Sequence, residues 1–204
     1  MTFPKMSEVL AEGTKGDVTI EHFTVSDEES QFTALRGGMG YVPAGDYVRL
    51  LISGAVVMSD TRMEQFTNYD VLRESKGRVF IAGLGLGMIC HGIAAKPEVS
   101  KITVLELNEN VIDLVAPSLP EKVEVNQGDI FEYKPGRWEQ FDTIYFDVWN
   151  DICTDNLPQM GKLFRRFRKH LAPNGWMDCW CRDYLKKQRR KELQQERELS
   201  AWRL

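Results

Sequence analysis

The chain has 204 residues, of which 43% are hydrophobic and 27% are charged, and its formal net charge is -4 at pH 7. These values are typical of a soluble globular protein with one domain and a small additional unit, and the slightly acidic balance argues against a protein that coats nucleic acid. No apolar run approaches the length of a membrane span, and the first residues lack the apolar stretch of a signal peptide. We therefore expect a cytoplasmic protein with neither a nucleic acid nor a membrane as partner.

The four cysteines, Cys90, Cys153, Cys179 and Cys181, do not have the spacing of a metal site. They form no CxxC pair, and no histidine lies at zinc-finger spacing. We expect no metal ion, and reduced thiols that pack as small apolar groups.

The N-terminal part shows strand patterns and one helix. Residues 17–25 alternate like a half-buried strand, and residues 47–58 contain two β-branched runs around a Ser-Gly pair. A glycine-rich stretch at 37–40 separates them. A Ser-Gly pair between such runs indicates a hairpin. The pattern predicts a β-rich appendage over residues 1–60, followed by a helix from about residue 61 to residue 75.

From Arg78 onward, apolar strands alternate with helices. The expected strands have the sequences RVFIAGL, KITVLEL, VEVNQGD, FDTIYFDV and WMDCWC. The expected helices have the sequences GMICHGIAAK, NENVIDLVA and DNLPQMGKLFRRFRKHL. Such alternation is typical of a parallel sheet covered on both faces. We predict a doubly wound, mainly parallel, Rossmann-like α/β domain over residues 61–181, and a charged helix or tail over residues 182–204.

Three glycines, Gly83, Gly85 and Gly87, lie directly after the first of these strands and open the next helix. Glycine allows a tight turn and lets a ligand approach the backbone closely. The exposed amides at the start of a helix favour a carboxylate or a phosphate. Many strand–helix turns carry glycines for packing alone, so this motif needs support from its surroundings.

Acidic residues provide that support, because they follow the next three strands. Glu106 ends the second strand, where an acid can accept both hydroxyls of a ribose, and Asp129 ends the third, where it can accept from an adenine amino group. Asp147 ends the fourth strand and faces the same crevice. Each acid alone has about an even chance of being a solvated loop carboxylate, but all three together with the glycines indicate an adenosyl-binding site.

The motifs VFIAGLGLGM, ITVLELNENVI, GDIFEY, FDTIYFDVW and LAPNGW, in this order, resemble the class I S-adenosylmethionine-dependent methyltransferases. Within them the chain is most similar to the spermidine-synthase-like branch. Ile81 stands where methyltransferases usually carry an acid, and LLISGAVVMSDTRMEQFTNYDVL resembles the hairpin and helix that precede the Rossmann domain of aminopropyltransferases. The resemblance covers roughly residues 47–181.

The resemblance implies an S-adenosylmethionine-dependent transferase that acts on a small molecule. It implies the following cofactor-binding residues: Gly83, Gly85 and Gly87 for the methionine end and the sugar, Glu106 for the ribose, Asp129 with Ile130 for the adenine, and in addition Leu107 and Asp147. It implies Asp147 and Asp151 as the catalytic candidates. Methyl transfer needs few obligatory catalytic residues, because it depends mostly on aligning the acceptor.

Two departures from the spermidine synthases weaken aminopropyl transfer from decarboxylated S-adenosylmethionine. Leu86 stands where those enzymes hold the amino group of their cofactor with an Asp. Asn150 stands at the position of their catalytic Asp, with Asp151 one place later. Aminopropyl transfer to a polyamine stays an alternative, as does a non-catalytic binding or assembly protein that keeps the fold. A nicotinamide dehydrogenase fits less well, because its third glycine would fall at Met88.

The end of the chain is the other departure, since the class I fold adds a β-hairpin after the fifth strand and residues 182–204 show no strand pattern. We expect this hairpin to be lacking, and an exposed N-terminal edge makes a homo-oligomer plausible. His91 is more simply a packed side chain than a general base, and Trp149 fits a pocket wall and ordinary packing equally well. The basic residues of the 157–171 segment are expected to form a solvated face; they are Arg165, Arg166, Arg168 and Lys169.

Overall fold

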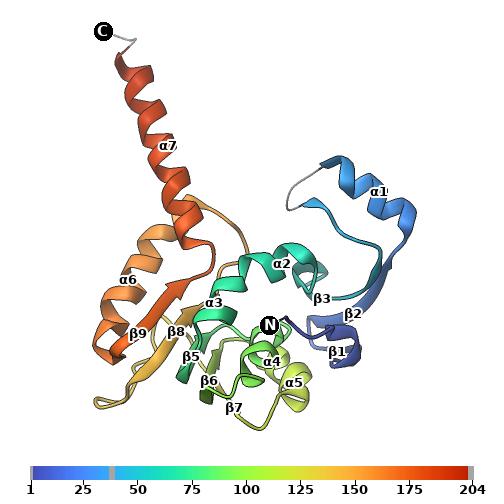
Figure 1. The fold of residues 1–204 in the computed structure, drawn as a ribbon, viewed down its shortest axis with the longest axis horizontal. Coiled ribbons are helices and arrows are strands. Elements are labelled where there is room, and N and C mark those ends of the chain that lie inside the picture. The colour runs from blue at the N-terminus through green and yellow to red at the C-terminus, as the bar shows by residue number, and fades with distance from the viewer. Residues whose placement is uncertain (1, 37–39, 202–204) are drawn as a thin grey trace.

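The computed structural model describes residues 2–36 and 40–201, so most of the glycine-rich stretch at 37–40 lies outside the described residues. The described chain forms two sheets with helices around them (Figure 1). Within these two ranges, no helix combines the length and the apolar character that crossing a bilayer requires.

The N-terminal sheet is antiparallel, with the strand order β1-β2-β3-β4. Its elements are η1 (Met6–Glu8), β1 (Gly13–Lys15), β2 (Val18–Val25), α1 (Asp27–Arg36), β3 (Gly45–Ile52) and β4 (Ala55–Ser59). Strands β3 and β4 pair as the expected hairpin, and Ser53 and Gly54 at its turn have φ values of 51° and 79°. Two consecutive positive φ values match the twist of a two-residue hairpin. The predicted β-rich appendage is therefore present.

The helix expected from residue 61 to residue 75 is divided into α2 (Arg62–Thr67) and α3 (Tyr69–Glu74). The two meet at Asn68, a fully buried residue with φ -101° and ψ 8°. Its side chain donates to the carbonyl of Glu64 at 3.1 Å and accepts from the hydroxyl of Tyr145 at 2.9 Å. The prediction of one continuous helix was therefore wrong, because Asn68, anchored by these two bonds, leaves the helical conformation.

The second sheet is parallel, with the strand order β7-β6-β5-β8-β9. Its strands are β5 (Gly77–Ala82), β6 (Val99–Glu106), β7 (Val123–Gln127), β8 (Phe141–Phe146) and β9 (Leu171–Cys179). The connections contain α4 (Met88–Ala94), α5 (Glu109–Val115), η3 (Ala116–Ser118), η4 (Thr154–Asn156), α6 (Leu157–Phe167) and η5 (Arg168–His170). The strand order reverses at β5, which leaves the carboxyl ends of β5 and β8 at the switch point where open α/β sheets bind ligands.

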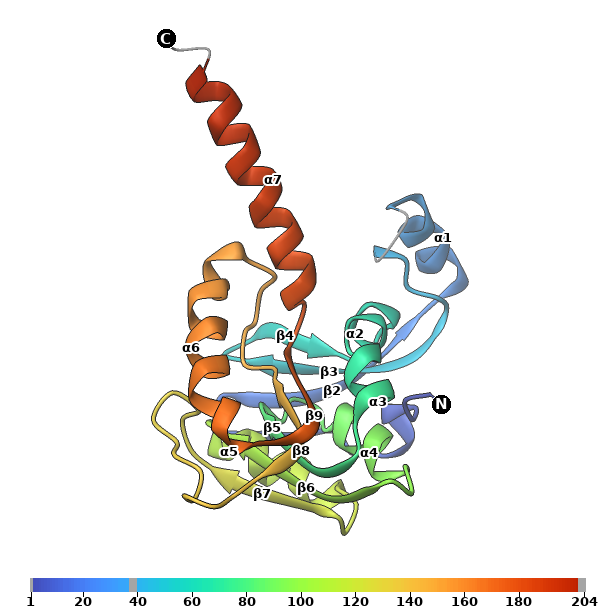
Figure 2. The same cartoon turned by 60° about the vertical axis from the view of Figure 1, so that its left-hand side comes forward.

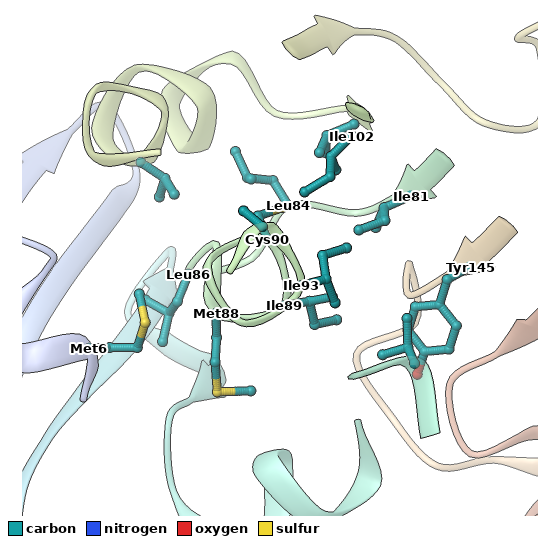
Figure 3. Close-up of a cluster of buried hydrophobic side chains, with 14 of the residues drawn as sticks. Met6, Ile81, Leu84, Leu86, Met88, Ile89, Cys90, Ile93, Ile102 and Tyr145 are labelled. Carbon is teal, nitrogen blue, oxygen red and sulfur yellow. The ribbon is translucent and has the colours of Figure 1, made fainter. Parts of the chain in front are cut away.

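Both faces of this sheet are covered, as successive residues of β5 show. Val79 and Ile81 belong to a core shared with α4 and the N-terminal elements, whereas Phe80 and Ala82 belong to a core shared with α6. In Figure 3 the apolar side chains of α4 pack between the strands on one side and Met6 on the other. The predicted doubly wound, Rossmann-like α/β fold is confirmed.

The chain ends in α7 (Arg182–Ala201), which projects away from the two sheets (Figure 2). Leu185 anchors its first turn in the core, and Glu192 accepts a hydrogen bond from the hydroxyl of Thr154 at 3.2 Å. No strand follows β9 in the part of the chain that the structure describes, so the expected lack of a C-terminal β-hairpin is met there. The 182–201 part of the expected charged helix or tail is a helix.

Candidate functional site

A cavity of about 380 Å³ lies between the carboxyl ends of the parallel strands and the N-terminal hairpin. Its size falls in the usual range for pockets that hold small ligands. The turn after β5 and the residues that end β6, β7 and β8 contribute one wall. Strands β3 and β4 contribute the facing wall with four apolar residues, namely Leu50, Ile52, Val57 and Met58. Residues of both sheets therefore line the cavity.

The glycine turn takes a backbone conformation that side chains rarely adopt. Gly83, Gly85 and Gly87 have φ values of 97°, 52° and 74°. A Cβ at Gly83 would overlap the carbonyl oxygen of Asp147, and one at Gly85 would overlap the sulfur of Met58. Gly83 and Gly85 line the cavity, whereas Gly87 faces apolar side chains of the α5 region and does not reach it. The turn thus brings bare backbone to the cavity at two of the three glycines.

Glu106 is held at the end of β6 by hydrogen bonds to two backbone amides. Its Oε2 accepts from the amide of Leu84, and its Oε1 accepts from the amide of Asn108, both at 2.8 Å. A carboxylate oxygen has two lone pairs, so each oxygen can still accept one hydroxyl. The neighbouring Leu107 also lines the cavity and is 66% exposed.

The loop after β7 brings Asp129 and Ile130 to the same cavity. Oδ1 of Asp129 accepts from the amide of Phe131 at 2.7 Å, and Ile130 is buried. Arg166 of α6 donates to the carbonyls of Ile130 and Phe131. The expectation that Arg166 belongs to a solvated face was therefore wrong, because its guanidinium turns back onto this loop, while its neighbour Arg165 is exposed.

Two further carboxylates in the cavity lining receive no side-chain hydrogen bond from the described residues. Asp147 follows β8, and Glu64 extends from α2. Burial raises the pKa of Asp147 to about 8, with a further contribution from the charge of Glu64. Burial also raises the pKa of Glu64 to about 7. Burial therefore favours the neutral, protonated form of both carboxyls relative to exposed ones, and the charge of Glu64 adds to this effect at Asp147.

The segment after β8 carries the remaining candidate residues, and only some of them line the cavity. Trp149 and Asn150 line the cavity, and Nε1 of Trp149 donates to Oε1 of Gln159 at 2.9 Å. Asp151 lies outside the cavity lining, and its Oδ1 accepts from the side-chain amide of Asn156 at 3.3 Å. The structure therefore brings Asp147, and not Asp151, to the cavity.

His91 and the cysteines lie away from the cavity lining. Burial lowers the pKa of His91, which favours the neutral imidazole, and its Nε2 is buried without a partner among the described residues. Burial raises the pKa of the Cys90 thiol to about 12, and Cys179 is buried as well. Cys90 and Cys179 are packed side chains. Cys181 is half-buried, and the charges of Asp147 and Glu64 contribute, after burial, to raising the pKa of its thiol.

The sequence analysis missed Glu64, Met58 and Trp180. Glu64 is 8% exposed, and an acid on a short helix gives no periodic signal that it points inward. The sulfur of Met58 accepts from the amide of Leu86 at 3.4 Å and so ties β4 to the glycine turn. Trp180 lines the cavity directly after β9 and donates to the hydroxyl of Thr67 at 3.0 Å. Of the three, only Trp180 had a signal, because it lies at the carboxyl end of the predicted strand WMDCWC.

No family model matches the chain, and no curated protein matches it. Its fold is similar to solved structures of S-adenosylmethionine-dependent methyltransferases. The N-methyltransferase NodS from Bradyrhizobium japonicum WM9, in complex with S-adenosyl-L-homocysteine, is 19% identical, with a TM-score of 0.47 over 59% of this chain and 62% of that one. A methyltransferase from Mesorhizobium loti is 20% identical, with a TM-score of 0.44 over 54% of this chain and 51% of that one. A DhpI–SAM–HEP complex is 20% identical, with a TM-score of 0.45 over 55% of this chain.

The chain spans between 51% and 66% of the length of the first structures it matches. At these identities the likeness is one of fold. The parallel strand order β7-β6-β5-β8-β9 with helices on both faces is a doubly wound, Rossmann-like arrangement.

Proposed function

We propose that the protein binds S-adenosylmethionine in this cavity and catalyses methyl transfer to a small acceptor that carries an amine. The observation that carries the proposal is that two kinds of carboxylate line the cavity. Glu106 and Asp129 are fixed by backbone amides, whereas the buried Glu64 and the half-buried Asp147 receive no side-chain hydrogen bond from the described residues. The first pair suits a nucleoside, and the second suits a cation.

The residues present fit the cofactor. Each oxygen of Glu106 retains a lone pair for a ribose hydroxyl, and Asp129 can accept from an adenine amino group. Gly83 and Gly85 line the cavity, so the sugar and the methionine end can approach their backbone closely. Bound there, the cofactor supplies an electrophilic methyl group on a sulfonium.

Glu64 and Asp147 provide the groups that would bind and deprotonate the acceptor. An ammonium group entering the cavity would replace the missing hydrogen-bond donors of Glu64 and Asp147. A base with a pKa near 7 to 8 can take a proton from that ammonium at neutral pH, which frees the nitrogen lone pair for attack. The carbon–sulfur bond then breaks as the carbon–nitrogen bond forms. The apolar residues Ile52, Val57 and Trp180 line the same cavity.

Calorimetric titration with S-adenosylmethionine, S-adenosylhomocysteine and decarboxylated S-adenosylmethionine tests the first half of the proposal. We expect the two carboxylated ligands to bind more tightly than the decarboxylated one. A panel of primary and secondary amines, assayed by mass spectrometry for a gain of one methyl group, tests the second half. Binding of none of the three ligands would overturn the proposal, and binding without methylation of any amine would favour a non-catalytic binding protein.

Aminopropyl transfer is the second candidate, because a carboxylate pair is also what a polyamine needs. Leu86 argues against it. This residue is apolar, fully buried in the core and outside the cavity lining, so it offers no carboxylate to the amino group that a decarboxylated cofactor keeps after losing its own carboxylate. Tighter binding of the decarboxylated ligand in the same titration would restore this candidate.

A further inference from the structure

The guanidinium of Arg166 joins helix α6 to the loop that carries Asp129. Nη1 donates to the carbonyl of Phe131 at 2.6 Å, and Nη2 donates to the carbonyl of Ile130. Arg165 and Arg168, its basic neighbours on the same helix, are exposed. Arg166 is therefore distinguished from them by its direction and by its two bonds to consecutive carbonyls.

The two bonds act on the orientation of Asp129 through one peptide unit. The peptide between Ile130 and Phe131 gives its carbonyl to Arg166 and its N–H to Oδ1 of Asp129, the latter at 2.7 Å. A trans peptide is planar and holds its carbonyl and its N–H on opposite sides. Fixing the carbonyl therefore fixes the direction of the N–H, and with it the carboxylate that accepts from this N–H.

Among the described residues, only Arg166 donates to these two carbonyls. The peptide lies in a turn that the amides of Glu132 and Tyr133 close by donating to the carbonyl of Asp129 at 3.0 and 2.8 Å. Residues 128–140, between β7 and β8, contain turns but no helix or strand in the described structure. Tyr133 stacks on Phe80 with ring centroids 5.6 Å apart, which anchors the middle of the loop and not the peptide beside Asp129. Arg166 also has a desolvation cost, because its Nε is buried without a partner among the described residues. A half-buried arginine that serves only packing would be replaced at little loss by an apolar side chain.

We propose that Arg166 is a positioning residue that sets the adenine selectivity of the cavity by holding the Ile130–Phe131 peptide, and through it the carboxylate of Asp129. This inference rests on the proposed binding of S-adenosylmethionine. The carboxylate accepts from the amino group of adenine, whereas inosine carries a carbonyl at that position and offers no donor there. Selectivity between the two bases therefore measures how well the carboxylate is oriented.

The test compares Arg166→Met with the matched control Arg165→Met on the same helix. For each variant and the wild type, the affinities for S-adenosylhomocysteine and for its inosine counterpart are measured by calorimetry. We expect the wild type and Arg165→Met to prefer the adenine ligand by about tenfold or more, the value of one hydrogen bond to a charged group. We expect Arg166→Met to lose most of this preference, and Arg166→Lys to keep part of it, since lysine can still donate to a carbonyl.

Hydrogen exchange at the amide of Phe131, without any ligand, provides an independent measurement. It should become faster in Arg166→Met and stay unchanged in Arg165→Met. If Arg166→Met binds both ligands more weakly but keeps the wild-type ratio, or if Phe131 keeps its protection, the inference is overturned and the proposed function survives. If the wild type binds neither ligand, the proposed function fails and takes the inference with it.

Discussion

The two pairs of carboxylates in the cavity differ in what surrounds them. Glu106 and Asp129 accept hydrogen bonds from backbone amides beside them in sequence or in the sheet, so their oxygens are fixed before any ligand arrives. Glu64 and Asp147 receive no side-chain hydrogen bond from the described residues, and burial raises the pKa of both. The difference separates two tasks. Preorganised acceptors recognise a ligand, whereas under-solvated carboxylates bind or move a proton.

The largest expected effect comes from removing a carboxylate at the under-solvated pair. Asp147→Asn and Glu64→Gln should each lower the turnover of the methylated amine by about 10²-fold or more, the contribution typical of general base catalysis. Affinity for S-adenosylhomocysteine should change little. Asp151→Asn is the matched control, because Asp151 lies outside the cavity lining. Equal losses in turnover for Asp147→Asn and Asp151→Asn would contradict the assignment of the base.

The next effect concerns recognition at the preorganised pair. Glu106→Ala should weaken binding of S-adenosylhomocysteine by about 1–3 kcal/mol, because the two ribose hydroxyls and the amides of Leu84 and Asn108 lose their acceptor. Glu109→Ala, in the first turn of the adjacent α5, serves as the control. Calorimetry compares the two variants. An unchanged affinity in Glu106→Ala would remove this residue from the site.

A smaller effect on the unfolding free energy distinguishes a steric clash at a glycine from the cost of a positive φ. Gly83→Ala and Gly54→Ala both place a side chain at positive φ, but only the Cβ at Gly83 meets a neighbour, the carbonyl oxygen of Asp147. Each variant should lose about 1 kcal/mol of unfolding free energy from conformation alone. Gly83→Ala should lose more than Gly54→Ala and should also weaken cofactor binding, as measured by denaturant unfolding and calorimetry. Equal unfolding losses would mean that the turn relaxes around the added methyl group.

The last effect is a dependence of stability on pH. The pKa of Asp147 rises from 3.8 to about 8 on folding, so the folded state binds more protons than the unfolded state between these values. Its contribution to the unfolding free energy therefore falls as the pH rises through this window, by at most about 1.4 kcal/mol per pH unit. Asp147→Asn should remove this contribution, so the variant should gain stability relative to the wild type from pH 5 to about pH 8. A constant difference across this range would show that Asp147 is ionised throughout.

The sequence was sufficient for the parallel domain because its signals are local. Continuous apolar strands, the turn at Gly83 and the acids at strand ends such as Glu106 all follow from patterns within a few residues. Asn68 divided a predicted helix, since its side chain bonds to Tyr145, 77 residues away in sequence. Glu64 was not predicted for a similar reason, because the tertiary packing of α2, and not a local sequence pattern, places its side chain in the cavity lining.

Arg166 also shows that contacts between distant segments cannot be predicted from local patterns. Its position opposite the apolar stripe of α6 predicted a solvated side chain, and the exposed Arg165 agrees with that rule. Arg166 departs from it because the irregular loop after β7 lies within reach of its guanidinium. The path of a loop without secondary structure has no periodic signature, so contacts with it cannot be read from the spacing of residues on a helix.

One wall of the cavity belongs to the N-terminal sheet and the other to the parallel sheet, so the acceptor specificity can change while the nucleoside-binding residues stay the same. The hairpin of β3 and β4 contributes Ile52 and Val57 to the cavity, and both are partly buried in its lining. Substitutions at these positions change the shape of the cavity without altering Glu106 or Asp129 on the opposite wall. Met58 is the exception, because its sulfur bonds to the glycine turn. A library randomised at Ile52 and Val57, with Met58 kept, would sample new acceptors while it preserves the nucleoside-binding wall.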